Sequence, residues 1–412
     1  MMPPPPAPRR VLILNHNLRY HGTYFRALEV GRRLARRGHV VTLVTTGPGY
    51  YRARKEQLGN LTIWESPSGF SPALTSPDDG WSPLGLLWRL GLAVFQRWDV
   101  VYAFSHKPVD AWPARWARRL RGSAWIADWC DLYGGPGIHA MRRAGREKVH
   151  ALQDRVEAWD GRLEEATARD CDFLTVISAD LLSRAEELGR GEEALHLLRN
   201  GANLDGISPQ DRRDCRARLG LAHITAPLLG YIANYHPDQD LLLDAVGRAA
   251  RENREAQFIV AGNPLYDQDK ALDKHGLTDR TLILGRISDE VLPWFFGACD
   301  VLLLPLSDTP FNRSRFPYKA TDYLAAGRPQ VACAVGDVPA VLGGAPEVAA
   351  LCEPTAEAFA AAALALLDDP PRRQSTGENA RRRAEDRFAW NALVQSLLTA
   401  YNGTRTRDRH RL

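Results

Sequence analysis

The chain has 412 residues, of which 45% are hydrophobic and 25% are charged, and its net charge is +4. This is ordinary globular composition, and the length predicts two or three domains. The small net charge argues against a nucleic-acid-binding protein, which would carry a concentrated basic face. No apolar run in the sequence approaches the ~20 residues that a membrane-spanning helix needs.

The two simplest composition signals concern the N-terminus and the cysteines. The first ten residues, "MMPPPPAPRR", lack the apolar core of a signal peptide, so we expect a disordered tail over residues 1–10. The six cysteines are scattered and form no CxxC pair. They are therefore interpreted as free thiols in a reducing cytoplasm.

The first half of the chain alternates β-rich runs with helical patterns. Helices are expected over about 23–37 and 138–169, and strands over 11–15, 38–45, 61–66, 98–105, 123–129 and 172–178. Such alternation predicts a mainly parallel sheet with helices on both faces.

A second series of the same kind begins near Pro227. Helices are expected over 240–251, 288–297 and, at the end, 371–401, and strands over 228–233, 257–262, 281–287, 301–306 and 330–335. The fold class is therefore α/β, with two doubly wound, Rossmann-like domains facing each other across a cleft. The turn-rich stretch "RNGANLDGISPQ" marks the join. The expected division is a domain over 11–203, a domain over 204–385, and a final helix over 386–403 that packs back on the first domain.

Polar side chains that follow strands of the first domain are candidates for a site. His16, Asn17, Arg19, His21 and Gly22 precede a helix, whose free N–H groups would suit a phosphate. A plain tight turn explains these residues equally well. The stretch is not GxGxxG, which argues against a dinucleotide fold of the usual kind.

Two later strand ends offer further candidates. His106 follows "DVVYAF" and could act as a hydrogen-bond donor or a base, or it could be an ordinary loop histidine. Asp128 and Asp131 could hold hydroxyl groups of an acceptor, or they could cap the next helix.

The stretch "RFPYKATDYLAAGRPQVACA", residues 315–334, concentrates charge beside a predicted core strand. Lys319 and Asp322 are three apart on one helix face. A lysine at a helix start opposes the helix dipole, which favours an anion delivered to the same place. An aspartate beside it could accept hydrogen bonds from two ribose hydroxyls. The alternative is a solvated Lys–Asp pair.

An ordered set of segments resembles retaining glycosyltransferases of family 4, which have the GT-B fold. The segments are "HGTYFRALEVGRRLARRGHVVTLVT", "FLTVIS", "LLRNGAN", "ILGRISDEVLPWFFGACDVLLLPL" and "PYKATDYLAAGRPQVA". The resemblance implies transfer of a sugar from a nucleoside diphosphate sugar with retention and without a metal. The donor would bind mainly the C-terminal domain and the acceptor the N-terminal domain.

The resemblance also implies roles for individual residues. His106 matches the histidine of the family's His–Glu–Pro segment, here "HKP", which lies near the transferred sugar. Asp322 matches the second glutamate of the family's paired-glutamate motif, which holds the ribose. His21 and Gly22 match the loop under the diphosphate. The remaining donor-binding candidates, at matched loops of the C-terminal domain, are Asn234, Gly262, Asn263, Arg286 and Ile287.

The sequence departs from the family where a cation pair normally clamps the diphosphate. Asn234 stands in place of the arginine, Gln239 in place of the lysine and Asp240 in place of a glycine. Ser314 replaces the first glutamate of the paired motif. We expect Arg315 and Lys319 to supply the missing cations, with Arg313 and His236 behind them, because a leaving diphosphate needs fixed positive charge. The rival interpretation is a degenerate donor site.

Other functions remain as alternatives. The same fold could carry a nucleotide-sugar epimerase or a phosphorylase, but the catalytic groups of those reactions find no match. A non-catalytic binding or partner protein is the third possibility. Two DxD strings, which include Asp238 and Asp267, are interpreted as chance, and we expect no metal.

The sequence also supports expectations about partners and location. The partners are a nucleotide-sugar donor and a hydroxyl-bearing acceptor, in the cytoplasm. Arginine-rich, alanine-rich composition fits a bacterial envelope-glycan or secondary-metabolite pathway. The tryptophan- and arginine-rich region over 81–129 is either a peripheral membrane contact or a set of core tryptophans with solvated arginines.

Overall fold

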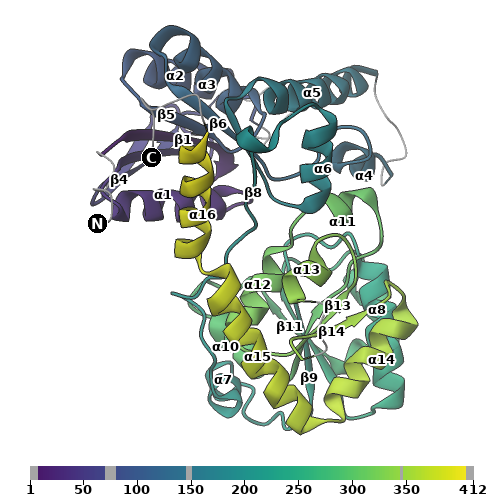
Figure 1. Cartoon of the computed structure of the whole chain (residues 1–412). Coiled ribbons are helices and arrows are strands. Elements are labelled where there is room, and N and C mark those ends of the chain that lie inside the picture. Colours follow the sequence, from purple (N-terminus) through teal and green to yellow (C-terminus); the bar gives the residue numbers. More distant parts are fainter. Residues whose placement is uncertain (1–7, 70–79, 145–150, 344–346, 405–412) are drawn as a thin grey trace. The chain divides into compact units, whose positions relative to one another are not determined.

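The computed structural model describes residues 8–69, 80–144, 151–343 and 347–404 (Figure 1). The chain divides into two compact units, Met1–Arg199 with Trp390–Leu412, and Asn200–Ala389. Each unit is described by itself. Most of the expected N-terminal tail, residues 1–7, lies outside the described residues, and Arg10 already begins the first strand.

The first unit is built on an eight-stranded sheet with the order β3-β4-β2-β1-β5-β6-β7-β8. All neighbouring strands are parallel except β3 and β4. β5 and β6 are buried along their whole length, as expected for parallel strands covered on both faces. The strands are β1 (Arg10–Leu18), β2 (Val40–Thr46), β3 (Arg54–Leu58), β4 (Leu61–Ser66), β5 (Val100–Ala103), β6 (Ala124–Trp129), β7 (Phe173–Val176) and β8 (Leu195–Leu197).

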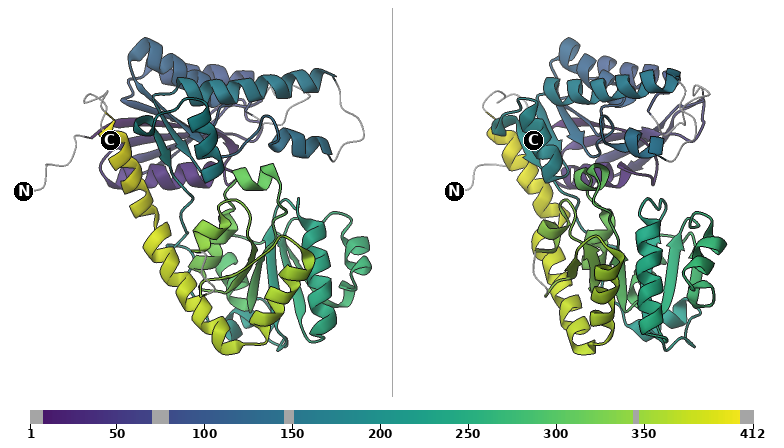
Figure 2. Two further views of the ribbon diagram at one scale, coloured as in Figure 1. Left: turned by 45° about the vertical axis from the view of Figure 1, so that its right-hand side comes forward. Right: turned by 90° about the vertical axis from the view of Figure 1, so that its right-hand side faces the viewer.

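Helices cover both faces of this sheet. Figure 2 shows α2, α3 and α5 on one face, and α1 and α16 on the other. The helices are α1 (Tyr24–Arg36), α2 (Pro83–Phe95), α3 (Pro108–Arg121), α4 (Ile138–Ala144), α5 (Ala151–Asp170), α6 (Ala179–Glu187) and α16 (Trp390–Gly403), with a 3₁₀ turn at Glu192–Ala194.

The second unit has a six-stranded, fully parallel sheet with the order β11-β10-β9-β12-β13-β14. The strands are β9 (Leu228–Ala233), β10 (Gln257–Gly262), β11 (Thr281–Gly285), β12 (Val301–Leu304), β13 (Gln330–Cys333) and β14 (Ala350–Cys352). The helices are α7 (Arg212–Arg218), α8 (Gln239–Glu252), α9 (Gln268–Lys274), α10 (Leu292–Ala298), α11 (Pro310–Ser314), α12 (Tyr318–Ala325), α13 (Val338–Leu342), α14 (Ala356–Leu367) and α15 (Pro370–Phe388), with a 3₁₀ turn at Thr278–Arg280.

The predicted α/β class, with two mainly parallel sheets, is confirmed. Three short strands, β3, β8 and β14, were not predicted. β1 continues to Leu18, three residues beyond the predicted end, so His16 and Asn17 are strand residues and not loop residues. The stretch predicted as one helix over 138–169 forms α4 and α5, and the stretch over 371–401 forms α15 and α16.

The division into units falls close to the predicted boundaries, after Arg199 and Ala389 instead of after residues 203 and 385. α16 belongs to the first unit, where the Asn391 carbonyl accepts from Arg37 Nη2 at 3.1 Å. The expected cleft between two facing domains stays a prediction. None of the helices in the described ranges combines the length and apolarity needed to cross a bilayer.

Candidate functional site

In the second unit, three neighbouring strands end in loops that are linked by hydrogen bonds. β11, β10 and β9 lie side by side in the sheet, so the loops after Gly285, Gly262 and Ala233 meet at one edge. Gly262 has φ +104°, and a Cβ on it would lie 2.0 Å from the Ala233 carbonyl oxygen. Only glycine fits this close approach of two backbones.

Asn263 connects the predicted donor-binding residues of these loops. Its Nδ2 donates to the Asn234 carbonyl at 2.7 Å, and its Oδ1 accepts from Arg286 Nε at 2.7 Å. The Asn263 carbonyl lies 2.9 Å from His236 Nε2. The predicted residues Asn234, Gly262, Asn263 and Arg286 are thus brought together, and Ile287 follows Arg286 directly.

Gln239, which stands where the family has a lysine, is held by the backbone of the next loop. Its Nε2 donates to the Tyr266 carbonyl at 2.8 Å, and its Oε1 accepts from the Tyr266 N–H at 2.7 Å. The side chain is 8% exposed. Gln239 therefore fixes the loop after β10 and presents no charge to a ligand.

Asp238 anchors one of the two predicted cations, Arg315, beside the loop that follows β12. Its Oδ1 accepts from the Ser307 N–H at 2.8 Å and from Asn312 Nδ2 at 2.9 Å. Its Oδ2 lies 3.4 Å from Arg315 Nη2. The Arg315 guanidinium also lies over the Phe311 ring, 4.5 Å from its centroid. The carboxylate and the aromatic ring together fix where the guanidinium lies.

Lys319 lies in the first turn of α12, and its Nζ is 4.4 Å from the centre of the Tyr231 ring. Burial, and to a lesser degree the charge of Arg315, lower the pKa of Lys319 to about 7 against the opposing effect of Asp238. The negative charge around Lys319 is thus too weak to keep its ammonium group fully protonated at neutral pH. An anion placed beside the ammonium group would remove this deficit.

Asp322 lies one turn further along α12 and is the predicted ribose ligand. Burial, with a smaller contribution from Asp289, raises the pKa of Asp322 to about 7 against the opposing effect of a hydrogen bond from the Asn203 backbone. The pKa values of Lys319 and Asp322 are therefore shifted toward each other. Arg313, expected behind the cations, instead binds Asp308 on the surface with Nε–Oδ1 at 2.6 Å and Nη2–Oδ2 at 2.7 Å.

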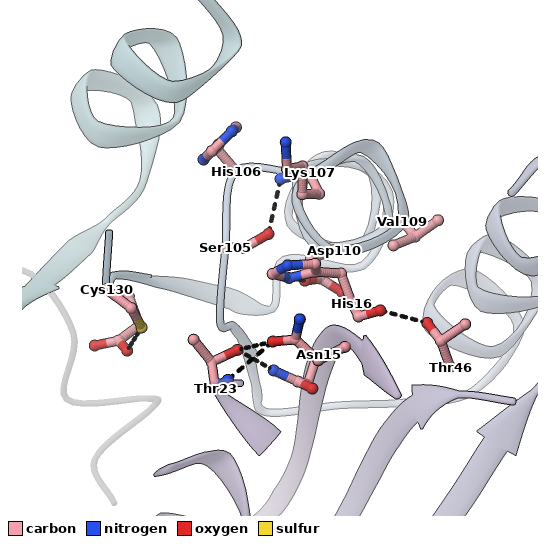
Figure 3. Close-up of polar contacts among 12 residues, drawn as sticks. Asn15, His16, Thr23, Thr46, Ser105, His106, Lys107, Val109, Asp110 and Cys130 are labelled. Atoms are coloured by element: carbon pink, nitrogen blue, oxygen red, sulfur yellow. Dashed lines mark hydrogen bonds and ion pairs between the residues drawn. The ribbon is translucent and has the colours of Figure 1, made fainter. Parts of the chain in front are cut away.

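In the first unit, a buried carboxylate gathers three basic side chains (Figure 3 shows two of them, His106 and Lys107, beside α3). Asp160 of α5 is 1% exposed, and its oxygens lie 3.2 Å from His106 Nε2, 2.5 Å from Lys107 Nζ and 2.8 Å from His139 Nε2. Burial alone would raise the pKa of Asp160, but His106, His139 and Lys107 hold it well below its usual range. Asp160 is therefore a fixed negative charge that orients His106.

Tyr133 completes this cluster. Lys107 Nζ lies 4.0 Å from the centre of the Tyr133 ring, and the ring of His106 lies 4.9 Å from it in an edge contact. Lys107 stands where the family has a glutamate, and Asp160 from a distant helix balances the changed charge. Sequence reasoning missed Asp160, His139 and Tyr133 because they join His106 only in the folded chain.

The loop before α1 holds its shape through Asn17. Asn17 Oδ1 accepts from the Thr23 N–H at 2.9 Å and from Thr23 Oγ1 at 2.7 Å. Asn15 Nδ2 donates to Thr23 Oγ1 at 2.6 Å (Figure 3). Gly22 has φ +49°, and a Cβ on it would lie 2.7 Å from Asn17 Oδ1. His21 is exposed on this loop. The geometry accounts for the glycine by itself, and the phosphate role of His21 and Gly22 stays a prediction.

Asp128 has structural partners on both carboxylate oxygens. It is 2% exposed and binds Arg26 through Nε–Oδ2 at 2.7 Å and Nη2–Oδ1 at 3.0 Å. Thr175 Oγ1 donates to its Oδ1, and Cys130 Sγ lies 2.6 Å from its Oδ2. We therefore correct the expectation that Asp128 holds the acceptor or caps a helix, because the side chain ties α1 to the sheet. Asp131 is half-buried in the turn after β6, and its acceptor role stays a prediction.

No group of three or more His, Cys, Asp or Glu side chains that could hold a metal ion is found within the described ranges. Asp238, from one of the DxD strings, is committed to the contacts with Ser307, Asn312 and Arg315.

In comparisons with known proteins, each of the two units matches a glycosyltransferase family. The family described as "Glycosyl transferase 4-like domain" matches residues 22–201, and the family described as "Glycosyl transferases group 1" matches residues 226–369. Together the two matches cover most of both sheets.

Curated relatives are similar at moderate identity. An MMP alpha-(1->4)-mannosyltransferase of Mycolicibacterium hassiacum is 27% identical over 251 residues, which are 60% of this chain and 58% of the relative. The chain thus spans less than two thirds of that relative's length. A 2-deoxystreptamine glucosyltransferase of Streptomyces kanamyceticus is 26% identical over 366 residues, 83% of this chain and 89% of the relative.

Solved structures share the fold. Sucrose-phosphate synthase from Thermosynechococcus elongatus has a TM-score of 0.73 at 18% identity, covering 95% of this chain and 98% of that one. Anabaena Alr3699/HepE in complex with UDP-glucose has a TM-score of 0.70 at 15% identity, with the same coverage. At these identities the likeness establishes the architecture.

Proposed function

Because the chain belongs to the group 1, family-4-like glycosyltransferases of the GT-B fold, we propose that it transfers a sugar from a nucleoside diphosphate sugar to a hydroxyl acceptor. The observation that carries the proposal is Lys319. It is a lysine with a pKa near 7, beside Arg315, in the domain that matches the group 1 family. A diphosphate leaving group would supply the anion that this lysine lacks.

The proposed donor is a UDP- or GDP-hexose, held by the loops after β9, β10 and β11. Arg315 and Lys319 bind the phosphates, and Asp322 accepts from the ribose hydroxyls. Asn234, Gly262, Asn263, Arg286 and Ile287 surround the base. The structurally similar Anabaena Alr3699/HepE was solved in complex with UDP-glucose. Two curated relatives are named as a mannosyltransferase and a glucosyltransferase, which favours a hexose.

The proposed reaction retains the configuration at the anomeric carbon and uses no metal. His106 lies beside the transferred sugar and is oriented by Asp160. Arg315 and Lys319 stabilise the negative charge that develops on the diphosphate, as positioned cations do in sites that exclude water. His21 and Gly22 approach the diphosphate from the loop before α1, and Asp131 binds the acceptor.

We place the reaction in the cytoplasm of a bacterium, in envelope-glycan or secondary-metabolite assembly. All six cysteines are free thiols, in agreement with a reducing compartment. Two bacterial relatives are named a 2-deoxystreptamine glucosyltransferase and a putative teichuronic acid biosynthesis glycosyltransferase, and these names support the two kinds of pathway. Peripheral contact with the inner face of the membrane is part of the proposal.

A donor screen by thermal shift, followed by a hydrolysis and transfer assay, tests the function. A nucleotide sugar at 100 times its Kd stabilises the protein by about 2.7 kcal/mol, which is a measurable shift of the melting temperature. We expect one base and one hexose to stand out, and the same donor to be turned over when an acceptor is present.

The second candidate is a non-catalytic protein with a degenerate donor site, which the neutral residues Asn234 and Gln239 favour. Calorimetric binding of the donor with neither hydrolysis nor transfer to any of a panel of sugar, inositol and aminocyclitol acceptors would favour that candidate. Absence of binding by every nucleotide sugar would contradict both.

A further inference from the structure

Helix α2 is apolar on nearly every side, although most of it is not enclosed by the protein. Its sequence, PLGLLWRLGLAVF, has one charged residue, Arg89, which is fully buried against Asp110 at 2.6 Å. The buried residues of α2 are Gly85, Arg89 and Ala93, a narrow stripe with a spacing of four. Helices that are hydrophobic all round are normally buried on all sides. The apolar side chains outside this stripe therefore lack the cover that their composition calls for.

Helix α3 packs beside α2 (Figure 1). Arg121 Nε donates to the Val94 carbonyl at 2.5 Å, which joins the C-terminal ends of the two helices. Four of the eleven large apolar side chains that are exposed in the described chain lie on this pair, so the surface is a concentration and not a chance scatter. They are Leu87 at 67%, Phe95 at 82%, Trp116 at 43% and Leu120 at 58% exposure.

The exposed charges of this surface that lack an ion pair among the described residues are all positive. Asp110 is the acidic residue of the two helices, and it is completely buried. Arg97, Arg119 and Arg121 are exposed and make no ion pair among the described residues, whereas Arg115 and Arg118 of the same region bind Asp170 and Asp172. We call Leu87, Phe95, Arg97, Trp116, Arg119, Leu120 and Arg121 the α2–α3 face.

We propose that the α2–α3 face docks the protein on an anionic lipid bilayer. The four apolar side chains would enter the boundary between headgroups and acyl chains, and the arginines would bind lipid phosphates while their stems lie along the apolar surface. The proposal deepens the proposed placement at the inner membrane face. It does not depend on which sugar or acceptor the protein uses.

Charge complementarity favours a bilayer over a second copy of the chain. A two-fold interface places the same patch on both subunits, so the arginines of the face would meet arginines without an acid between them. An anionic bilayer offers phosphates at any position under the face. Each arginine near such a surface contributes about 1 kcal/mol, or about a fivefold change in affinity.

Co-sedimentation of the full chain with vesicles tests the proposal. We expect at least tenfold stronger binding to vesicles with about one third phosphatidylglycerol than to pure phosphatidylcholine, and weaker binding at higher salt. The variant Arg97→Gln/Arg119→Gln should bind the anionic vesicles about 25-fold more weakly, at fivefold for each charge. Its matched control is Arg382→Gln/Arg387→Gln, which removes two exposed arginines of α15.

The apolar part has its own pair of variants. Leu87→Ser/Phe95→Ser should reduce binding tenfold or more at every salt concentration, because the loss is hydrophobic. The control Leu58→Ser removes an exposed leucine of β3 and should leave binding unchanged. Circular dichroism and unchanged nucleotide-sugar binding establish that each variant is folded.

Three results would overturn the proposal. The first is equal vesicle binding by the α2–α3 variants and their controls. The second is concentration-dependent dimerisation that Leu87→Ser/Phe95→Ser abolishes while vesicle binding persists, which would assign the face to a second copy. The third is binding of polyglutamate through Arg97 and Arg119 without binding of vesicles, which would assign it to an acidic protein.

Discussion

Asp160 is the residue on which the polar cluster of the first unit depends. It is enclosed, and its carboxylate is the common partner of His106, Lys107 and His139. Removing one partner of a buried charged set leaves the others without compensation, which costs far more than the loss of a surface pair. A residue that no motif identifies therefore controls the orientation of the predicted catalytic histidine.

We predict that Asp160→Asn lowers turnover at least tenfold and that Asp160→Glu restores part of it, since a carboxylate and not only a polar group is needed to orient His106. Steady-state transfer kinetics check this, with Asp170→Asn, an exposed aspartate at the end of the same helix, as the control. A purely structural role would give parallel losses of stability and activity in both Asp160 variants, without rescue by glutamate.

The same substitution carries a pH signature. The pKa of Asp160 is lower in the folded protein than in the unfolded chain, so its charge stabilises the fold above the ordinary aspartate pKa of about 3.9 and this contribution is lost as the pH falls. The difference in melting temperature between wild type and Asp160→Asn should be large at pH 7 and shrink below about pH 4. A difference that does not change with pH would contradict the assignment.

Lys319 should take up a proton when a diphosphate binds. Its pKa in the free protein is about 7 because burial disfavours the charge, and an anion beside the ammonium group raises that pKa. At pH 8 the free lysine is mostly neutral, so binding of a nucleoside diphosphate should be accompanied by uptake of up to one proton.

Calorimetry in buffers with different ionisation enthalpies measures this uptake. Lys319→Gln should reduce the uptake strongly, whereas Lys270→Gln, an exposed lysine of α9, should not change it. Uptake that is the same in Lys319→Gln would show that another group responds, with Asp322 next to be examined because its pKa is also about 7.

At the scale of elements, continuous apolar runs were sufficient to predict the sheets. β5, β6, β9, β10, β12 and β13 all lie within ranges expected from the sequence, because parallel strands buried on both faces require uninterrupted apolar residues. β3 could not be predicted in this way. Its sequence, RKEQL, is exposed and polar, and it forms as an edge strand only because β4 pairs with it. β8 and β14 have three residues each, too few to show a pattern.

The loops that carry the site were predicted less completely than the strands. The sequence indicated Gly262, Asn263 and Asn234, but not that Asn263 links them through its side chain. Gln239 was interpreted only as a lost lysine, whereas its amide pairs with the Tyr266 backbone. Such pairings join residues far apart in sequence, so that a single sequence without its fold contains no local signal for them.

Gly262 should be the most sensitive glycine of this region. Gly262→Ala would place a Cβ 2.0 Å from the Ala233 carbonyl, in addition to strain at φ +104°. Gly276→Ala is the matched control, since its φ is +67° and nothing lies within 4 Å of the added Cβ. Gly276→Ala should lower the free energy of unfolding by about 1 kcal/mol through backbone strain. Gly262→Ala should lower it by at least about 2 kcal/mol more and should weaken nucleoside binding. Thermal unfolding and calorimetry measure both, and equal effects in the two variants would contradict the close approach.

At the scale of the whole molecule, the two units are predicted to divide the reaction between them. The alternation of strands and helices predicted two α/β domains, and the structure and the comparisons confirm them. The resemblance to family 4 identified candidate residues in each unit. The sequence indicated Arg315 and Lys319 as replacements for the missing cation pair. It did not identify Asp238 as the partner of Arg315, because these two residues come together only through the pairing of β9 with β12.

The division of roles gives a prediction that separates binding from chemistry. His106→Ala should lower turnover about 10²-fold, the effect of losing one positioned polar group. Its affinity for nucleoside diphosphate should be nearly unchanged, because His106 is assigned to the transferred sugar and not to the phosphates. Lys319→Ala and Arg315→Ala should slow transfer and, in contrast to His106→Ala, should each also weaken diphosphate affinity tenfold to a hundredfold. The reason is that a charged hydrogen bond contributes about 1.5–3 kcal/mol.

The controls follow from the same assignment. His223→Ala, an exposed histidine of the second unit, should leave both quantities unchanged. Binding of the nucleoside without phosphates should be equal in wild type, Lys319→Ala and Arg315→Ala, because neither cation is assigned to the base or the ribose. If both cation variants keep full diphosphate affinity, the relocation of the cations is wrong. Arg19, which pairs with Glu56 and Glu65 in the free protein, would then be the next cation to test.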